Sequence, residues 1–221
     1  MSRPRPDWRL YLVTDPAMTA AYGLVETVLA AVRGGVGLVQ FRDTEADDDE
    51  FVARGRAVHE ALAGRVPLIV NDRVDLVSAI GAEGAHVGQH DMDISRARTI
   101  LGPDRLLGLS VQTIAQIEEA GRAGAGAIDY VGIGPVWDTA TKPDAASATG
   151  LDRTAAVAAA SPWPSVAIGG ISLNRVRRVH ATGVDGISVV SAICGRPDPH
   201  AAAAALLRAW DDSAHQHPRG G

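Results

Sequence analysis

The chain has 221 residues, a formal net charge of −5 and only 4% aromatic residues. This length can bury a full-sized core within one domain. The acidic balance leaves no basic face for nucleic acid, and the scarcity of aromatic side chains argues against a base-stacking surface. The lone cysteine, Cys194, excludes an intramolecular disulfide and a cysteine-based zinc cluster. We therefore expect the protein to reside in a reducing cytoplasm. Residues 1–10 lack the long apolar run of a signal peptide, and no segment is apolar enough to predict a membrane span.

Short apolar runs bounded by glycine or proline recur along the chain, and each predicts a buried parallel strand. In chain order they are 10–15, 37–42, 67–72, 84–89, 106–111, 130–135, 165–170 and 186–191. Helical segments lie between them; in 113–122 we expect a Thr113 cap and a buried face of Ile114, Ile117 and Gly121.

Eight strand–helix units predict a single α/β domain over residues 1–221, a (β/α)8 TIM barrel with eight parallel strands. Its core should span about 9–210, and 211–221 should form a frayed tail. An open doubly wound sheet is the alternative fold. It usually has fewer strands and a glycine-rich first turn, and residues 14–18 carry no such turn.

Polar residues gather where the predicted strands end, and a barrel places its active site at those ends. The polar strand-end residues are Gln40, Arg42, Asn71, Asp72, Gln89, His90, Asp91, Ser110 and Ser191. Stability alone does not require so many polar side chains on one face, so this end of the barrel is the predicted binding site.

Asp72 and Asp91 end neighbouring strands, so their carboxylates can converge. Two carboxylates, together with substrate phosphates and water, are a usual way of holding Mg²⁺. The alternative for each aspartate alone is a helix N-cap, because a helix follows both. As a pair facing Arg42 and Lys142, they favour the metal.

Lys142 is the only lysine in the chain and follows two threonines, Thr139 and Thr141. A compact ammonium in such a loop suits a phosphate, although a solvated loop lysine is the simpler reading. The loops after the last two strands begin with Gly169-Gly170 and Val190-Ser191, where barrels often bind phosphate. The glycine pair could also form only a tight turn. Two anionic regions suit a reaction that joins two phosphorylated substrates and releases pyrophosphate.

Seven segments together resemble the thiamine-phosphate synthase family. They are VQFRD, IVNDRVDL, GAHVGQHD, LGLSVQT, YVGIGPVWDTATKPDA, AIGGIS and GVDGISVVSAI, and the resemblance runs over nearly the whole chain. It implies a magnesium-dependent transferase that joins a pyrimidinylmethyl pyrophosphate to a thiazole phosphate and releases pyrophosphate. It also implies that the pyrimidinylmethyl–oxygen bond ionises before the thiazole nitrogen attacks.

The same resemblance implies a role for each matching residue. Gln40, Arg42 and Asn71 would hold the pyrimidine pyrophosphate, and Asp72 and Asp91 would ligate Mg²⁺. Ser110 and Lys142 would contact the pyrophosphate and, with Arg42, form the catalytic set. The thiazole phosphate would be bound by Thr139, Thr141, Gly170, Val190 and Ser191.

Two positions depart from the family pattern. Thr44 stands where the family usually has a lysine, and Gln112 stands where it often has a histidine. The alternatives are a thiazole tautomerase-like relative, which relies on that histidine, and a non-catalytic barrel that binds a phosphorylated thiamine precursor. The expected partners are small-molecule substrates, with neither nucleic acid nor membrane, and the sequence is compatible with a homo-oligomer.

Overall fold

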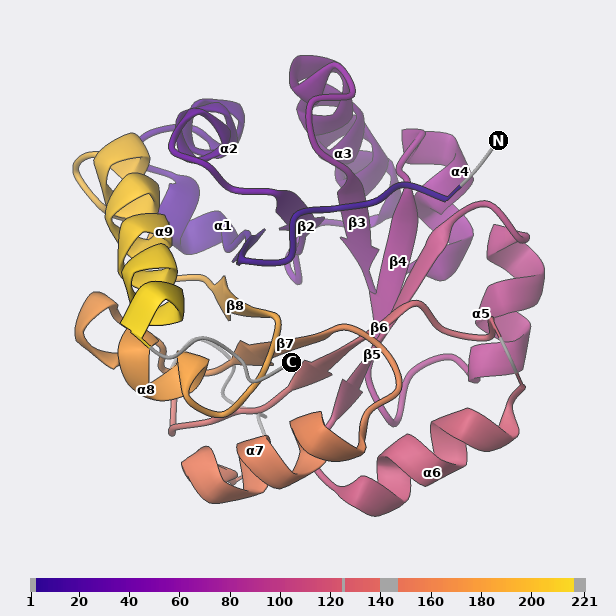
Figure 1. Cartoon of the computed structure of the whole chain (residues 1–221). Coiled ribbons are helices and arrows are strands. Elements are labelled where there is room, and N and C mark those ends of the chain that lie inside the picture. Colours follow the sequence, from indigo (N-terminus) through magenta and orange to yellow (C-terminus); the bar gives the residue numbers. More distant parts are fainter. Residues whose placement is uncertain (1–2, 125, 140–146, 217–221) are drawn as a thin grey trace.

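The computed structural model describes residues 3–124, 126–139 and 147–216. Within these residues, eight parallel strands close into a barrel in which β1 pairs with both β2 and β8, and this confirms the predicted TIM barrel (Figure 1). The strands are β1 (Leu10–Val13), β2 (Leu38–Phe41), β3 (Leu68–Asn71), β4 (Gly84–Val87), β5 (Leu106–Val111), β6 (Tyr130–Ile133), β7 (Ser165–Ile168) and β8 (Gly186–Val189).

Helices surround the barrel and cover the outer faces of the strands (Figure 1). They are α1 (Pro16–Thr19), α2 (Leu24–Arg33), α3 (Asp48–Leu62), α4 (Val77–Ile80), α5 (Ile94–Leu101), α6 (Ile114–Arg122), α7 (Gly150–Ala160), α8 (Val176–His180) and α9 (Pro199–Gln216). Short 3-10 turns, η1 (Val74–Leu76) and η2 (Leu173–Arg175), lead into α4 and α8.

Helix α6 begins as expected but buries a different face. Thr113 caps it by accepting a hydrogen bond from the Gln116 backbone N–H. Ile117 and Ala120 are buried, whereas Ile114 is 42% exposed. The expected buried face of Ile114, Ile117 and Gly121 is therefore wrong at its two ends, because the helix turns Ile117 and Ala120 inward and leaves Ile114 and Gly121 exposed.

The expected tail at 211–221 is shorter than the sequence suggested. Helix α9 continues to Gln216, so residues 211–216 are helical. Trp210 and Ser213 are buried, and the Ser213 hydroxyl donates to the Ala209 carbonyl. The Trp210 ring packs edge-on against His180 of α8, with ring centroids 4.7 Å apart, and this contact anchors α9 to its neighbour. No helix in the described part of the chain is long and apolar enough to cross a membrane.

The apolar core has two layers. The larger layer lies between the strands and the helices. A smaller layer fills the barrel interior and consists of Tyr11, Leu38, Ile69, Leu106, Tyr130 and Val166, with Trp8 packed against it. The barrel is therefore a filled core rather than a channel.

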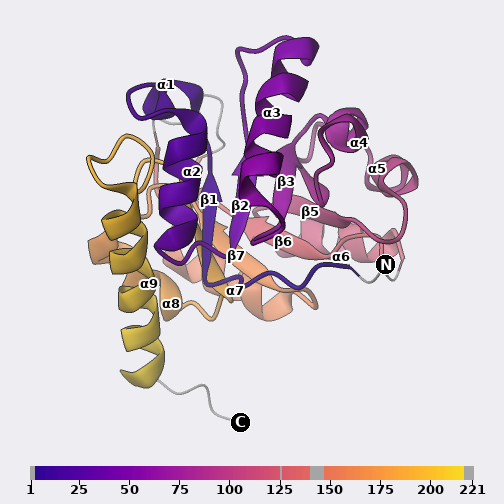
Figure 2. The same ribbon diagram turned by 90° about the horizontal axis from the view of Figure 1, so that it is seen from above.

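The segment before β1 crosses the end of the barrel opposite α1 (Figure 2). The Arg3 guanidinium lies 2.5 Å from Asp129, and Arg98 lies 2.6 Å from the same carboxylate. Asp129 also accepts a hydrogen bond of 2.8 Å from the Leu107 backbone N–H. With Trp8, these contacts cover this end of the barrel.

Candidate active site

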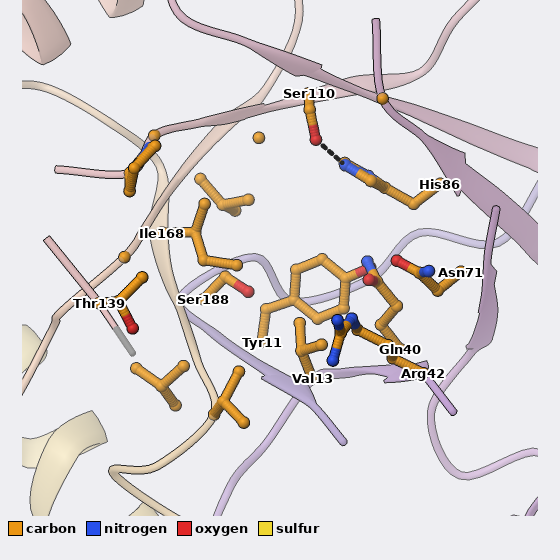
Figure 3. Close-up of a pocket in the computed structure, with 18 of the residues that line it drawn as sticks. Tyr11, Val13, Gln40, Arg42, Asn71, His86, Ser110, Thr139, Ile168 and Ser188 are labelled. Carbon is orange, nitrogen blue, oxygen red and sulfur yellow. Dashed lines mark hydrogen bonds between the residues drawn. The ribbon is translucent and has the colours of Figure 1, made fainter. Parts of the chain in front are cut away.

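A cavity of about 460 Å³ opens at the carboxyl ends of the strands. Most of the side chains predicted from the strand ends line it, and Figure 3 shows several of them converging from different strands. The predicted residues in its lining are Gln40, Arg42, Asn71, Asp72, Gln89, His90, Ser110, Thr139, Gly170, Val190 and Ser191. Thr141 and Lys142 lie outside the described residues.

Arg42 follows β2 and is held at the cavity wall by its neighbours. Its guanidinium lies 3.7 Å from the Asp15 carboxylate, and both side chains are 14% exposed. Its backbone N–H donates to the Thr14 hydroxyl, which itself donates to the Arg42 carbonyl. Asp15 in turn caps α1 through the Met18 N–H. A guanidinium fixed in this way retains donors that can meet an anionic ligand.

Asp72 has a left-handed backbone conformation, with φ of 58°. Aspartate is among the few non-glycine residues that tolerate this region. Its carboxylate accepts a hydrogen bond of 2.7 Å from the Asn71 amide. The turn that follows, η1, has Arg73 at its N-cap position, so the N-cap alternative for Asp72 does not hold.

Asp91 lies beyond β4, on the loop that carries Gly88. Its Oδ2 accepts a hydrogen bond of 2.8 Å from the Gly88 backbone N–H, and Gly88 lines the cavity. Asp91 itself is exposed and does not line the cavity wall. The N-cap of α5 is Asp93, which accepts from Ser95 and Arg96, so the N-cap alternative fails for Asp91 as well.

The donor set at this edge suits magnesium only with help from a ligand. Among the described residues, no group of three or more His, Cys, Asp or Glu side chains could hold a metal alone. Asp72 and Asp91 supply two carboxylates on the loops after adjacent strands, and Mg²⁺ commonly takes its other ligands from phosphates and water. The residues present therefore fit a metal that arrives with a pyrophosphate.

On the opposite side of the mouth, the backbone after β7 makes a narrow turn. Gly169 and Gly170 have φ of 102° and 65°, which side chains rarely adopt. A Cβ at Gly170 would lie 2.9 Å from Trp137 Cβ, so the turn has no room for one. Arg175 donates to the Gly170 carbonyl at 2.5 Å and stacks over Trp137 at 4.5 Å. The glycine pair is thus clamped against the loop after β6.

The two departures from the family pattern occupy different places. Gln112 lines the cavity, and its backbone N–H donates to Gln116. Thr44 is exposed. The neighbouring Asp43 carboxylate is buried and lies 2.6 Å from Arg54, so its charge is balanced locally instead of facing the cavity. Burial alone would raise the pKa of Asp43, but Arg54 and the backbone N–H groups of Glu45 and Ala46 lower it overall.

Sequence reasoning missed the floor of the cavity. Tyr11, His86 and Ser188 line it from inside the strands (Figure 3), and Tyr130 lies buried beneath them. The Ser188 hydroxyl is buried and has no hydrogen-bond partner among the described residues. One feature of the sequence could have revealed this floor. Tyr11 and His86 carry polar groups in the middle of strands that are otherwise apolar.

The chain is similar to known proteins over most of its length. A family model described as thiamine monophosphate synthase matches residues 10–193. A thiamine-phosphate synthase of Psychrobacter sp. (strain PRwf-1) is 49% identical over 198 residues, which cover 90% of this chain and 93% of that protein. Another, from Desulfitobacterium hafniense (strain Y51), is 44% identical over 205 residues, covering 92% and 98%. The solved thiamine phosphate pyrophosphorylase from Pyrococcus furiosus matches with a TM-score of 0.83 at 32% identity, covering 94% of this chain and 98% of that one.

Proposed function

Because the chain belongs to the thiamine monophosphate synthase family, we propose that it joins a pyrimidinylmethyl pyrophosphate to a thiazole phosphate. A bond forms between the pyrimidinylmethyl carbon and the thiazole nitrogen. The bond from that carbon to the pyrophosphate oxygen breaks, and pyrophosphate leaves with the electron pair. The observation that carries the proposal is the cavity at the carboxyl ends of the strands, which has charged and amide groups on one side and a glycine turn on the other.

The leaving pyrophosphate belongs on the side of β2 to β4. Arg42 and Asn71 would donate to its oxygens from the cavity wall. Asp72, in the same wall, and Asp91, which bonds Gly88 at its edge, would hold Mg²⁺ against them. When bound, the metal neutralises charge that grows on the leaving group. Such a site needs preorganised positive charge more than it needs a nucleophile from the protein.

The thiazole phosphate belongs on the side of β6 to β8. Gly170 allows an anion to approach the backbone closely, and Ser191 and Thr139 offer hydroxyl groups nearby. Val190 would flank the bound ring. We also place the reaction in the cytoplasm, since Cys194 is a free, buried thiol.

The test is pyrophosphate release with both substrates and Mg²⁺, compared with reactions that omit one substrate or include a chelator. Release that requires all three components supports the proposal. Binding without release would indicate a sensor, and proton exchange on the thiazole alone would indicate a tautomerase.

The metal assignment is tested by Asp72→Asn and Asp91→Asn, which should each abolish most pyrophosphate release without unfolding the barrel. Asparagine tolerates the left-handed backbone at position 72, so the change removes charge and little else. Asp75→Asn, at an exposed position of η1, and Asp93→Asn, which keeps a good helix cap, are matched controls. Near-parental activity of either test variant across a Mg²⁺ titration would refute the shared metal.

A further inference from the structure

A continuous chain of hydrogen bonds crosses the floor of the cavity. The Gln40 amide Nε2 donates to the Tyr11 hydroxyl at 2.8 Å, and the Tyr11 and Tyr130 hydroxyls lie 2.9 Å apart. The Tyr130 hydroxyl lies 3.0 Å from His86 Nδ1, and His86 Nε2 lies 2.9 Å from the Ser110 hydroxyl (Figure 3). We call these five residues the floor relay. Its two ends, Gln40 and Ser110, both line the cavity.

Two strand glycines make room for the relay. A Cβ at Gly108 in β5 would lie 2.2 Å from the Tyr130 ring and 2.4 Å from His86 Nδ1. A Cβ at Gly132 in β6 would lie 3.2 Å from the His86 ring. Tyr11 and Tyr130 are fully buried, and His86 is 8% exposed. The rings are therefore fixed in place, with little access for water to exchange their partners.

The direction of the protons along the relay follows from simple counting. Burial raises the pKa of both Tyr11 and Tyr130, so each phenol keeps its one proton. Tyr11 accepts a hydrogen bond from Gln40, so the acceptor for its own proton is Tyr130. Tyr130 then donates to His86 Nδ1, and the ring proton of neutral His86 resides on Nε2. The reverse order would leave the buried Tyr11 proton without an acceptor in the relay, which is costly.

This order assigns opposite roles to the two ends. His86 Nε2 donates to Ser110 Oγ, so the Ser110 hydroxyl proton is left for the cavity. Gln40 spends one of its two Nε2 protons on Tyr11, and its carbonyl oxygen is the acceptor that it can offer to a ligand. One end of the relay is thus an acceptor, and the other is a donor.

We infer that the floor relay selects an aminopyrimidine over its oxo analogue, with Tyr11, Tyr130 and His86 acting as positioning residues. The inference rests on the proposed function for the identity of the substrate. An aminopyrimidine offers an amine donor to Gln40 and a ring-nitrogen acceptor to Ser110. The oxo form offers a carbonyl and a ring N–H instead, so it sets acceptor against acceptor and donor against donor. A site that pairs polar groups in this way rejects a mismatched ligand strongly.

The direct test is the tautomer of His86 in the ligand-free protein, read by ¹⁵N NMR. The chain has seven histidines, and the His86 signal is assigned as the one that disappears in His86→Gln. We expect the shift of a protonated Nε2 and of an unprotonated Nδ1. A proton on Nδ1 would overturn the inference. This measurement needs no catalysis, so it judges the relay even if the protein releases no pyrophosphate.

The second test cuts the relay with Tyr130→Phe, which removes the hydroxyl that donates to His86 Nδ1. The two His86 tautomers should then mix, and the ¹⁵N shifts should move towards their average. The KM for the pyrimidine pyrophosphate and the preference for its amino form over its oxo form should each worsen about tenfold, the scale of one hydrogen bond. The KM for the thiazole phosphate should not change.

Tyr22→Phe is the matched control, because Tyr22 is 50% exposed and donates to Pro197, outside the cavity lining. It should leave all these values at parental levels. If Tyr130→Phe does not fold, Tyr11→Phe breaks the same relay at the Gln40 end. A folded relay variant with unchanged tautomer and unchanged discrimination would refute the inference.

Discussion

Gly108→Ala should destabilise the protein through one added methyl group. The new Cβ would lie 2.2 Å from Tyr130 Cζ and 2.4 Å from His86 Nδ1, well inside van der Waals contact. Neither ring can retreat easily, since Trp8 packs on Tyr130 with ring centroids 4.8 Å apart. Overpacking of this kind costs about 1–3 kcal/mol. The two close approaches place this change in the upper half of that range, about 2–3 kcal/mol. Removing a strand glycine returns up to about 1 kcal/mol, so we expect a net loss of about 1–2 kcal/mol.

Thermal unfolding measures the effect. For a chain of this size, 1 kcal/mol shifts Tm by about 2–4 °C, so Gly108→Ala should lower Tm by about 2–8 °C. Two matched glycine replacements calibrate the result. Gly132→Ala should fall between Gly108→Ala and the parent, because its Cβ would approach the His86 ring only to 3.2 Å. Gly121→Ala should raise Tm, since it lies in α6 with no heavy atom within 4 Å.

The order of these three variants is the sensitive part. If Gly108→Ala unfolds at or above the parental temperature while Gly121→Ala behaves as expected, the barrel interior is not packed as described. The steric argument for the floor relay would then fail with it. A lower Tm for Gly108→Ala together with a raised KM for the pyrimidine substrate would tie the packing of the interior to the ligand site.

Three further outcomes are expected. Ser188→Ala should raise the free energy of unfolding by about 1 kcal/mol, measured by denaturant titration, because it removes a buried hydroxyl with no partner among the described residues. Burial raises the pKa of Cys194 to about 12, so a thiol reagent at pH 8 should label it only as the protein unfolds; rapid labelling of the native protein would contradict its burial. Lys142→Ala should cost about 2–4 kcal/mol of transition-state stabilisation in kcat/KM, and Lys142→Arg should recover little; full activity would make Lys142 an ordinary loop lysine.

The strands could be predicted because each is a short apolar run that ends at a glycine, a proline or a polar residue. In β2, for example, the buried run Leu38–Phe41 is followed at once by Arg42. The end of α9 could not be predicted in the same way. Asp211, Asp212 and Ser213 resemble a solvated tail in composition, and only packing shows that Ser213 is buried.

The rim of the site was accessible to sequence reasoning, since polar residues at strand ends share one location in any barrel. The floor was not accessible, because the partners of Tyr11 and His86 come from other strands and depend on register. The N-cap alternative for Asp91 needed the exact start of α5, which Asp93 caps two residues later.

The closure of the barrel also constrains how the chain can fold. Leu10 and Tyr11 pair with Ile187 and Ser188, so the first strand completes its ladder only after nearly the whole chain has been synthesised. Arg3 likewise can form its ion pair with Asp129 only after the chain has been synthesised beyond residue 129. Contacts so distant in sequence carry a large loop-closure entropy and slow the search for the native state. Until β8 arrives, β1 has an unpaired edge, and the nascent barrel exposes the apolar interior that the finished protein conceals.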